Sequence, residues 1–516
     1  MQRFDNPDVI ITDVLSGHGK WRAGKSAIIY GDSRLTWKDF NRHINQVANG
    51  LIELGLKKGD RVSLLMSNRP EALEILFGAI RAGGVIVPLS VMVPGDSLAG
   101  MVVDSDSRFL FVDSDRRQVM DPFRGQFKQI APDRFISPGP EDGAWKSYSQ
   151  FLDGNPDHDP GVSLVYEDSI NIMYTSGTTG TPKGILHTHH NRLQFALSFG
   201  MDLRIDSGAV TIIATALYAN GTWLTMIPTL FAGGTLVLMP KFDPQEFMAL
   251  VEKERCTHAF MVPTQFTMVL EQPNFGRYDL NSVRIWLTAG SPFRAQTKQD
   301  VLQRFPGELI ELWGLTEGVA TTLKPEDMQR KTDSVGIPLV GWDVRIIDDQ
   351  GRELPSGEVG EIVAVSAWLM PEYYKLADKT AEAIWMNERG RTYLRTGDMG
   401  KLDEDGFLYV VDRKKDMIIS GGINVFASDL EQVISRHPAV KDVAVIGFTH
   451  EKWGETPVAI VILKVGTAVA EKELLDSINP KLAKYQRLTK IIFREEDFPR
   501  NALGKVLKRE LREAYR

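Results

Sequence analysis

The chain has 516 residues, too many for one hydrophobic core, which stops growing near roughly 250–300 residues, so at least two domains are expected. Its formal net charge of −7, with basic and acidic residues interspersed, argues against a surface for nucleic acid or for anionic membranes. A single cysteine, Cys256, excludes a disulfide framework. Without a signal-like start or a membrane-length apolar run, the sequence predicts a cytoplasmic protein with no integral membrane association.

The front of the chain repeats a helix-then-strand pattern. Apolar residues at helical spacing are followed by short β-branched runs that are apolar on both faces, which is typical of parallel sheets covered by helices. The expected helices are 44–56 and 69–84, and the expected strands are 57–68, 85–90, 209–216, 234–240, 257–264, 283–290 and 308–314. The sequence therefore predicts an α/β fold with mainly parallel sheets.

The texture changes further along the chain. Between about 343 and 411, short strands with Asp/Gly turns indicate a smaller antiparallel or barrel-like unit. The charged run "DRKKD" at 412–416 follows. After it come the elements of a small α+β unit, with expected helices at 427–437 and 471–483 and expected strands at 440–449, 456–465 and 488–495. We place a boundary near Lys415, which gives an N-terminal domain at 1–412, a connection at 413–416 and a C-terminal domain at 417–516.

The segment "YTSGTTGTPKG" at 174–184 has the composition of a phosphate-binding loop. A Walker-type loop needs a glycine where Pro182 stands and a hydroxyl where Gly184 stands, so this is not an ordinary P-loop. Its glycines and hydroxyls can still donate to phosphate oxygens, and Lys183 adds a mobile charge. A surface turn is the structural alternative.

Three weaker segments follow in order. "LWGLTEG" at 312–318 ends an apolar strand with a carboxylate suited to Mg²⁺, "YLRTGD" at 393–398 offers a carboxylate for ribose hydroxyls, and "PRNALGK" at 499–505 ends on a lysine. Each has an ordinary structural reading when taken alone, as a strand-end loop, a turn or a solvated lysine at a helix start. The three histidines of "HTHHN" at 187–191 lack a second Cys/His cluster, which disfavours a zinc site.

Together with "DRKKDMIISGG" at 412–422, these segments resemble the adenylate-forming superfamily, which includes acyl- and aryl-CoA synthetases. The resemblance runs from about residue 25 to Lys505. It implies a large N-terminal domain with a barrel-like unit, and a small mobile C-terminal α+β domain. It also implies ATP, Mg²⁺ and coenzyme A as cofactors, and it leaves a homodimer open.

The resemblance assigns roles to individual residues. Lys183 and Lys505 would be catalytic lysines, Thr316 would serve the α-phosphate, and Glu317 would be both catalytic and the Mg²⁺ ligand. Lys415 would be the hinge. The residues implied to bind ATP or CoA are Thr175, Ser176, Gly177, Thr178, Thr179, Gly180, Gly290, Ser291, Pro292, Trp313, Gly314, Asp398, Arg413, Gly421, Gly422 and Trp453.

Some positions depart from the family pattern. Ala219 stands where acyl-CoA ligases commonly have histidine after an aromatic residue, and the usual Gly-Pro-x-x-Met-x-Gly-Tyr segment reads "VSAWLMPEYY" at 365–374. Ala427 replaces a usual proline. The implied acyl pocket is mostly apolar, formed by Tyr218, Ala219, Trp223, Val262, Thr264, Thr288, Ala289, Gly290, Trp313, Gly318 and Val319.

Three functions are weighed. The first is an AMP-forming ligase that joins a carboxylic acid to CoA. The second is an adenylating enzyme that passes the acyl group to a carrier protein or a luciferase-like acceptor, and the third is a nucleotide-binding scaffold without catalysis. The retained charged residues argue against the scaffold, and Trp453 in "EKWGE" favours CoA. An apolar pocket enlarged at Ala219 favours a medium- or long-chain fatty acid or an aryl or aryl-alkanoic acid over acetate or a dicarboxylate.

Overall fold

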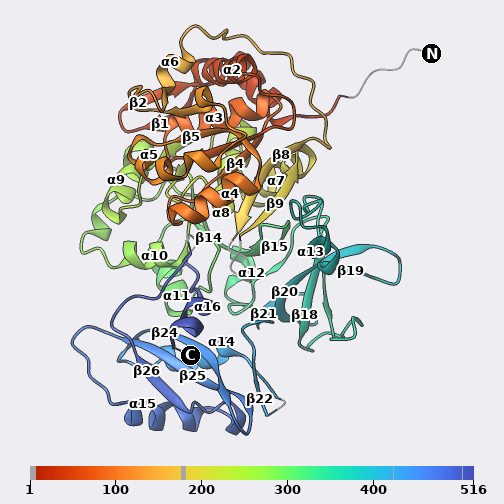
Figure 1. The fold of residues 1–516 in the computed structure, drawn as a ribbon. Coiled ribbons are helices and arrows are strands. Elements are labelled where there is room, and N and C mark those ends of the chain that lie inside the picture. The colour runs from red at the N-terminus through yellow and green to blue at the C-terminus, as the bar shows by residue number, and fades with distance from the viewer. Residues whose placement is uncertain (1–6, 176–181, 294, 422, 502–503, 516) are drawn as a thin grey trace. The chain divides into compact units, whose positions relative to one another are not determined.

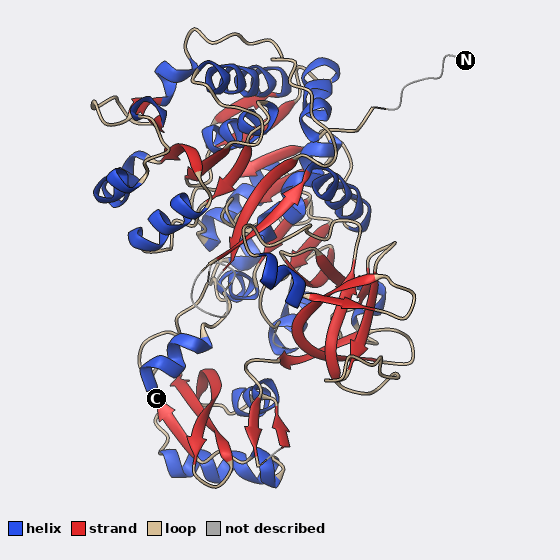
Figure 2. Cartoon of the chain, turned by 45° about the vertical axis from the view of Figure 1, so that its right-hand side comes forward, coloured by secondary structure: helices blue, strands red, loops and turns tan. Residues whose placement is uncertain are grey.

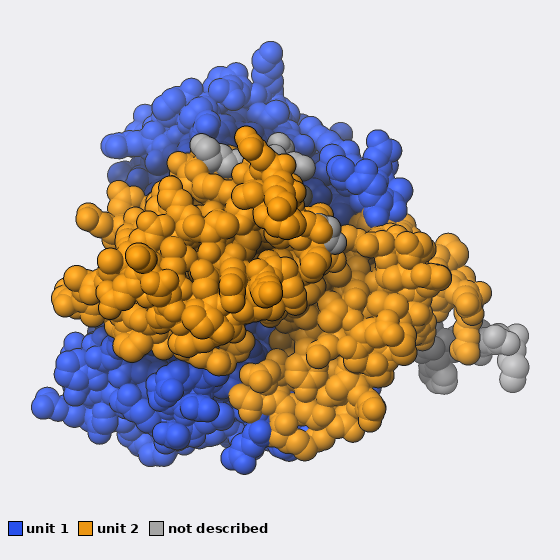
Figure 3. Space-filling view, turned by 90° about the horizontal axis from the view of Figure 1, so that it is seen from below, with its two compact units in different colours: residues 1–329, 338–342, 365–382 blue, residues 330–337, 343–364, 383–516 orange. Residues whose placement is uncertain are grey.

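The computed structural model describes residues 7–175, 182–293, 295–421, 423–501 and 504–515. The chain forms two compact units, which Figure 3 colours separately. The large unit comprises residues 1–329, 338–342 and 365–382, and the small unit comprises residues 330–337, 343–364 and 383–516. The chain passes between them five times, at 329/330, 337/338, 342/343, 364/365 and 382/383, and the second crossing falls within β16 (Ile337–Pro338). Among the described residues, no helix is long and apolar enough to cross a bilayer.

The first sheet of the large unit has the strand order β7-β6-β5-β3-β4-β8-β9. All neighbouring strands are parallel except the last pair, β8 and β9, which form an antiparallel hairpin. The strands are β3 (Arg61–Leu65), β4 (Val85–Pro88), β5 (Ser107–Val112), β6 (Phe135–Ser137), β7 (Lys146–Ser147), β8 (Ser169–Thr175) and β9 (Lys183–Thr188). The central strands are buried on both faces, as their continuous apolar sequences predict.

The second sheet of the large unit contains the order β15-β14-β13-β12-β10-β11-β1-β2. The six strands from β14 to β1 are parallel, and an antiparallel strand flanks this run on each side, with β16 paired beyond β15. The strands are β1 (Ser26–Tyr30), β2 (Ser33–Thr36), β10 (Val210–Ile213), β11 (Thr235–Leu238), β12 (His258–Met261), β13 (Ile285–Thr288), β14 (Glu308–Leu315) and β15 (Val319–Leu323). Because β10, β12, β13 and β14 are parallel neighbours, the loops at their carboxyl ends lie along one edge.

Helices cover these sheets (Figures 1 and 2). Local sequence sets their starts: the Thr36 side chain accepts from the Asp39 N–H at the start of α2, and Asp243 caps α9 just before Pro244. The helices are α1 (Ile11–Trp21), α2 (Trp37–Glu53), α3 (Pro70–Arg81), α4 (Gly95–Asp104), α5 (Arg117–Met120), α6 (Tyr148–Leu152), α7 (His189–Asp202), α8 (Asn220–Ala232), α9 (Pro244–Glu254), α10 (Pro263–Leu270), α11 (Ala295–Arg304), α12 (Pro325–Met328) and α13 (Ala377–Glu382).

The small unit begins with a curled antiparallel sheet (Figure 2), in the order β17-β18-β20-β19 with β21 also paired to β20. These strands are β17 (Asp343–Ile347), β18 (Gly360–Val365), β19 (Ile384–Met386), β20 (Thr392–Leu402) and β21 (Leu408–Arg413). The barrel-like unit predicted between about 343 and 411 is therefore present.

The rest of the small unit is a second sheet, in the order β23-β22-β25-β24 with β26 parallel to β25, and three helices. Its elements are β22 (Ile418–Ser420), β23 (Ile423–Val425), α14 (Ala427–Ser435), β24 (Val440–His450), β25 (Gly454–Leu463), α15 (Glu471–Ile478), β26 (Lys490–Phe493) and α16 (Lys508–Tyr515). A buried aliphatic cluster that includes Leu430, Val461 and Leu474 packs this α+β layer together. The predicted fold class is confirmed, while the domain boundary near Lys415 stays a prediction.

Candidate active site

The predicted phosphate-binding segment lies between the two strands of the β8–β9 hairpin in sequence. Thr175 is the last residue of β8 and lies opposite Lys183, the first residue of β9. The predicted contacts Ser176, Gly177, Thr178, Thr179 and Gly180 lie outside the described residues. Since strand pairing joins the two flanking residues, the hairpin holds Lys183 at the base of the segment.

A second hairpin carries the predicted Mg²⁺ ligand. Leu315 at the end of β14 lies opposite Val319 at the start of β15, so Thr316, Glu317 and Gly318 form the turn. Gly318 has a φ of 121°, and a Cβ on it would come within 2.5 Å of the Cα of Leu369. Glycine is therefore required at this turn. The Glu317 side chain beside it is half-exposed.

A buried histidine fastens the two hairpins to each other. The Nε2–H of His187, on β9, donates to the carbonyl oxygen of Thr316 at 2.9 Å. Its Nδ1 accepts from the Asn171 amide at 3.1 Å and from Arg192 at 3.2 Å. Burial, and then the charge of Arg192, hold the pKa of His187 well below its usual value, so the ring stays neutral with one tautomer. His187 thereby fixes the Thr316–Glu317 turn against β9.

Arg192 is a fully buried cation that is absent from the predicted site residues. Its Nε donates to Asn171 at 2.7 Å and its Nη1 to Asn220 at 3.0 Å, and the guanidinium lies 4.6 Å from the centre of the Trp223 ring. Burial lowers its pKa to about 9. Because Asn220 starts α8 directly after Ala219, Arg192 links the β8–β9 hairpin to the predicted wall of the acyl pocket. The one sequence feature that could have identified Arg192 is its position on the face of α7 that carries the buried residues.

The predicted acyl and adenine residues lie along the carboxyl ends of the second sheet. They follow β10, β12 and β13, or flank the turn between β14 and β15. The buried residues of this set are Ala219, Trp223, Val262, Thr288, Ala289, Gly318 and Val319. Tyr218, Ser291 and Trp313 are half-exposed. Thr264, Gly290, Pro292 and Gly314 are exposed. The Trp223 indole N–H donates to the Leu217 carbonyl at 2.8 Å, so this ring is fixed in place.

The small unit gathers a second group of predicted residues. Asp398 on β20 lies opposite Arg413 on β21, and its carboxylate is 2.9 Å from the arginine Nε. Lys505 is half-buried and interacts with both of these residues and with Asp416 and Lys415. Burial, with a smaller contribution from Arg413, lowers the pKa of Lys505 to about 8. The predicted adenylation lysine and ribose-binding pair therefore lie together.

The predicted CoA-side residues are farther along the same unit. The Gly421 N–H donates to the Trp453 carbonyl at 2.8 Å, and a Cβ on Gly421 would approach the indole ring to 2.9 Å. Gly421 has a φ of 59°, and the Trp453 side chain stays 46% exposed. The glycine thus supports an aromatic surface, while Gly422 lies outside the described residues.

Family models match both parts of the chain. The AMP-binding enzyme model matches residues 18–374, and the AMP-binding enzyme C-terminal domain matches residues 429–505. The chain belongs to the AMP-binding enzyme family. Our prediction of an adenylate-forming enzyme of the acyl-CoA synthetase class is confirmed.

Individual members of the AMP-binding enzyme family match over nearly full length. The long-chain-fatty-acid–CoA ligase FadD13 of Mycobacterium tuberculosis is 34% identical, with 94% of each chain covered. The feruloyl-CoA synthase of an Amycolatopsis species is 32% identical, over 97% of this chain and 99% of that one. Among solved structures, ATP-bound MatB from Rhodopseudomonas palustris has a TM-score of 0.88 at 29% identity, with 98% and 99% covered.

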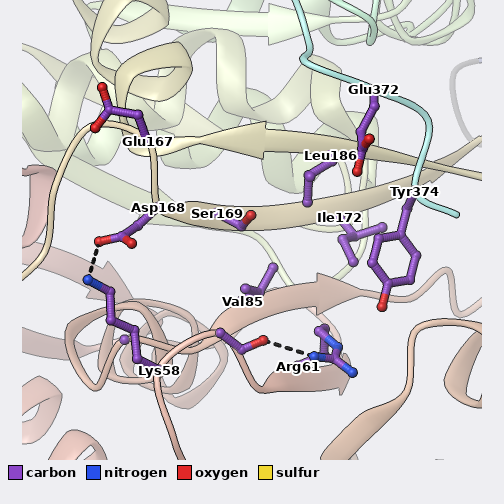
Figure 4. A pocket seen from close by; sticks show the side chains of 12 residues that line it. Lys58, Arg61, Val85, Glu167, Asp168, Ser169, Ile172, Leu186, Glu372 and Tyr374 are labelled. Atoms are coloured by element: carbon purple, nitrogen blue, oxygen red, sulfur yellow. Dashed lines mark hydrogen bonds and ion pairs between the residues drawn. The ribbon is translucent and has the colours of Figure 1, made fainter. Parts of the chain in front are cut away.

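A separate cavity of about 550 Å³ lies beside the β8–β9 hairpin (Figure 4). None of the predicted site residues lines it. Two of its cations are already engaged, since Lys58 pairs with Asp168 at 2.6 Å and Arg61 donates to backbone carbonyls that include Gly59. The cavity is thus set apart from the candidate active site.

Proposed function

We propose that this enzyme activates a carboxylic acid with ATP, releasing pyrophosphate to give an acyl-AMP, and then transfers the acyl group to CoA. The observation that carries the proposal is the pairing of two hairpins in the large unit, one bearing Lys183 and the other Glu317. The His187–Thr316 hydrogen bond joins these hairpins. The names of the relatives support ATP and CoA as the co-substrates.

The side chains present fit Mg²⁺ and ATP. One oxygen of Glu317 accepts from Tyr373 at 2.9 Å, and the other has no hydrogen-bond partner among the described residues. Lys183 makes no ion pair with a carboxylate in the part of the chain that the structure describes. A carboxylate with an open oxygen suits Mg²⁺, which when bound offsets phosphate charge. An unpaired ammonium suits the β,γ-phosphates.

In this proposal the residues of the small unit act on the nucleoside and on the reacting centre. Asp398 accepts the ribose hydroxyls, while Arg413, paired with it, keeps the carboxylate oriented. Lys505 places a positive charge where the anionic acid and the anionic α-phosphate meet. Two anions repel each other on approach, so this cation matters most in adenylation.

We further propose that the chain alternates between the two half-reactions by rotation at Lys415. The predicted division is an N-terminal domain at 1–412, a hinge at 413–416 and a C-terminal domain at 417–516. Lys415 is exposed, between Arg413, which pairs with Asp398, and Asp416, which pairs with Arg512 at 2.8 Å. Anchored neighbours on both sides concentrate a dihedral change at Lys415.

The proposed substrate is a medium- or long-chain fatty acid, or an aryl or aryl-alkanoic acid. The predicted pocket residues are mostly apolar, and Ala219 leaves more room than a histidine would. A fatty-acid ligase and a feruloyl-CoA synthase among the relatives support this range.

The test is pyrophosphate release across a panel of short, long-chain, aryl and dicarboxylic acids, with and without CoA. We expect release with fatty or aryl acids, and multiple turnovers with CoA. If CoA did not stimulate pyrophosphate release and the acyl group were transferred to a carrier protein, the carrier protein would be the acceptor instead of CoA. No release with any acid would overturn the proposal.

A further inference from the structure

Residues 368–376, which we call the strap, run along the free edge of β9. The Tyr374 N–H donates to the Gly184 carbonyl at 2.8 Å, and the Leu186 N–H donates to the Glu372 carbonyl at 3.2 Å. Tyr373 forms an antiparallel bridge with Ile185. The strap thus extends the β8–β9 hairpin by one more extended segment, and it includes part of the segment that departs from the family pattern.

The strap also reaches the second hairpin. The Met370 N–H donates to the Glu317 carbonyl oxygen at 2.7 Å, and the Tyr373 hydroxyl donates to Glu317 Oε1 at 2.9 Å. The Tyr373 ring centre lies 5.0 Å from the Lys183 ammonium, within reach of a cation–π contact. One buried side chain, 8% exposed, therefore contacts both the predicted phosphate lysine and the predicted Mg²⁺ ligand.

Tyr374, the next residue, has a different environment. Successive side chains of an extended segment point to opposite faces. The Tyr374 hydroxyl donates to Asp106 at 3.2 Å, and its ring lines the separate cavity shown in Figure 4. The strap thus provides a neighbouring tyrosine that contacts neither Lys183 nor Glu317.

The arrangement keeps two opposite charges available. A lysine and a glutamate in direct contact would neutralise each other and would have to separate before binding Mg²⁺ and phosphate. The tyrosine ring attracts Lys183 through its π face without neutralising it. The Tyr373 hydroxyl donates to Glu317 Oε1 and so fixes the orientation of one carboxylate oxygen.

We propose that Tyr373 is a positioning residue, which keeps Lys183 and Glu317 apart and oriented so that both are free to bind Mg·ATP. This inference rests on the proposed roles of Lys183 and Glu317 in adenylation. Tyr373 does not contact the reacting atoms in this account; it acts through the two residues that do.

The first test compares Tyr373→Phe with Tyr374→Phe as the matched control. Loss of a hydrogen bond to a charged group costs roughly tenfold or more. We therefore expect Tyr373→Phe to raise, by about that factor, the Mg²⁺ concentration for half-maximal pyrophosphate release. Calorimetry should show weaker binding of Mg·ATP and unchanged binding of ATP in EDTA. Tyr374→Phe should match the wild type in all of these measurements.

The second test is Tyr373→Leu, which also removes the ring and should additionally weaken binding of ATP in EDTA. Thioester formation from supplied acyl-AMP should be unaffected in both Tyr373 variants. A Tyr373→Phe protein with the Mg²⁺ dependence of Tyr374→Phe would overturn the inference, as would equal losses in both half-reactions and in Tm. If the wild type released no pyrophosphate with any acid, the proposed function would fail, while calorimetry would still decide the role of Tyr373.

Discussion

The two lysines assigned to adenylation, one in each unit, have contrasting surroundings. Lys183 starts a strand of the large unit, and its ammonium lies against the Tyr373 ring rather than beside a carboxylate of the described residues. Lys505 is in the small unit among Asp398, Asp416, Arg413 and Lys415, and its pKa falls to about 8. The same side chain is thus placed once against an aromatic face and once within a dense cluster of both signs.

The difference suggests different duties. A lysine against an aromatic ring keeps an unshared charge, as is needed to hold phosphates that are present throughout adenylation. The protonation of a lysine in a charged cluster depends on the neighbouring charges and on pH.

Lys505→Ala should slow acyl-AMP formation by roughly 10²–10³-fold, the usual cost of losing one transition-state contact. Thioester formation from supplied acyl-AMP should be nearly normal, because that step needs no cation between two anions. Pyrophosphate release and single-turnover thioester assays measure the two steps separately. Comparable losses in both would contradict the assignment.

Lys415→Pro should have the reverse effect. Proline fixes φ near −65°, so the chain can still adenylate but cannot rotate at this position for the thiol step. We expect thioester formation to fall about a hundredfold, the cost of a misplaced reacting group. Lys415→Ala is the control that leaves the backbone free. A proline variant that loses single-turnover adenylation would show that Lys415 is not the hinge.

The pH dependence of adenylation should reflect Lys505. Its folded-state pKa lies below the usual lysine value, so the ammonium is present below about pH 8 and is lost as pH rises through that value. The kcat/KM for ATP should then fall about tenfold per pH unit above 8. In Lys505→Arg, the guanidinium stays charged, so the residual activity should be flat from pH 7 to 9. An equal decline in both proteins would assign the titration to another group.

Ala219→His should have the smallest effect and should depend on the substrate. Ala219 is buried directly before α8, and an imidazole there would take up volume that the proposed acid occupies. We expect a several-fold loss of kcat/KM for the largest accepted acids and little change for small ones. A uniform loss across a chain-length series would instead place the residue on the CoA route.

Much of the small unit could be predicted because its elements are encoded locally. The apolar run 456–465 became β25 (Gly454–Leu463), and the helix expected at 471–483 ended at Ile478 because Pro480 cannot continue it. The bounds of these elements depend on residues close in sequence, so the pattern of apolar residues and turn formers predicts them directly.

The connections around the candidate site could not be predicted in the same way. Tyr373 contacts Lys183 across 190 residues, counting from 183 to 373, and His187 contacts Thr316 across 129. Neither contact leaves a local pattern, since a tyrosine or histidine in an apolar stretch usually indicates ordinary packing. A departure from a family segment at 365–374 marked the region, but only tertiary structure shows which residue of it matters.

The buried Arg192 network has an evolutionary consequence. Its guanidinium is held by two asparagine oxygens and one neutral histidine, and no carboxylate of the described residues pairs with it. Replacing Asn171, Asn220 or His187 alone would leave part of a buried cation unsatisfied, whereas replacing the whole set with apolar residues of similar volume need not cost stability. These positions should therefore be inherited as a block. Replacement of this charged network by an apolar one would then require several substitutions together, because the single mutants on the way would fold poorly.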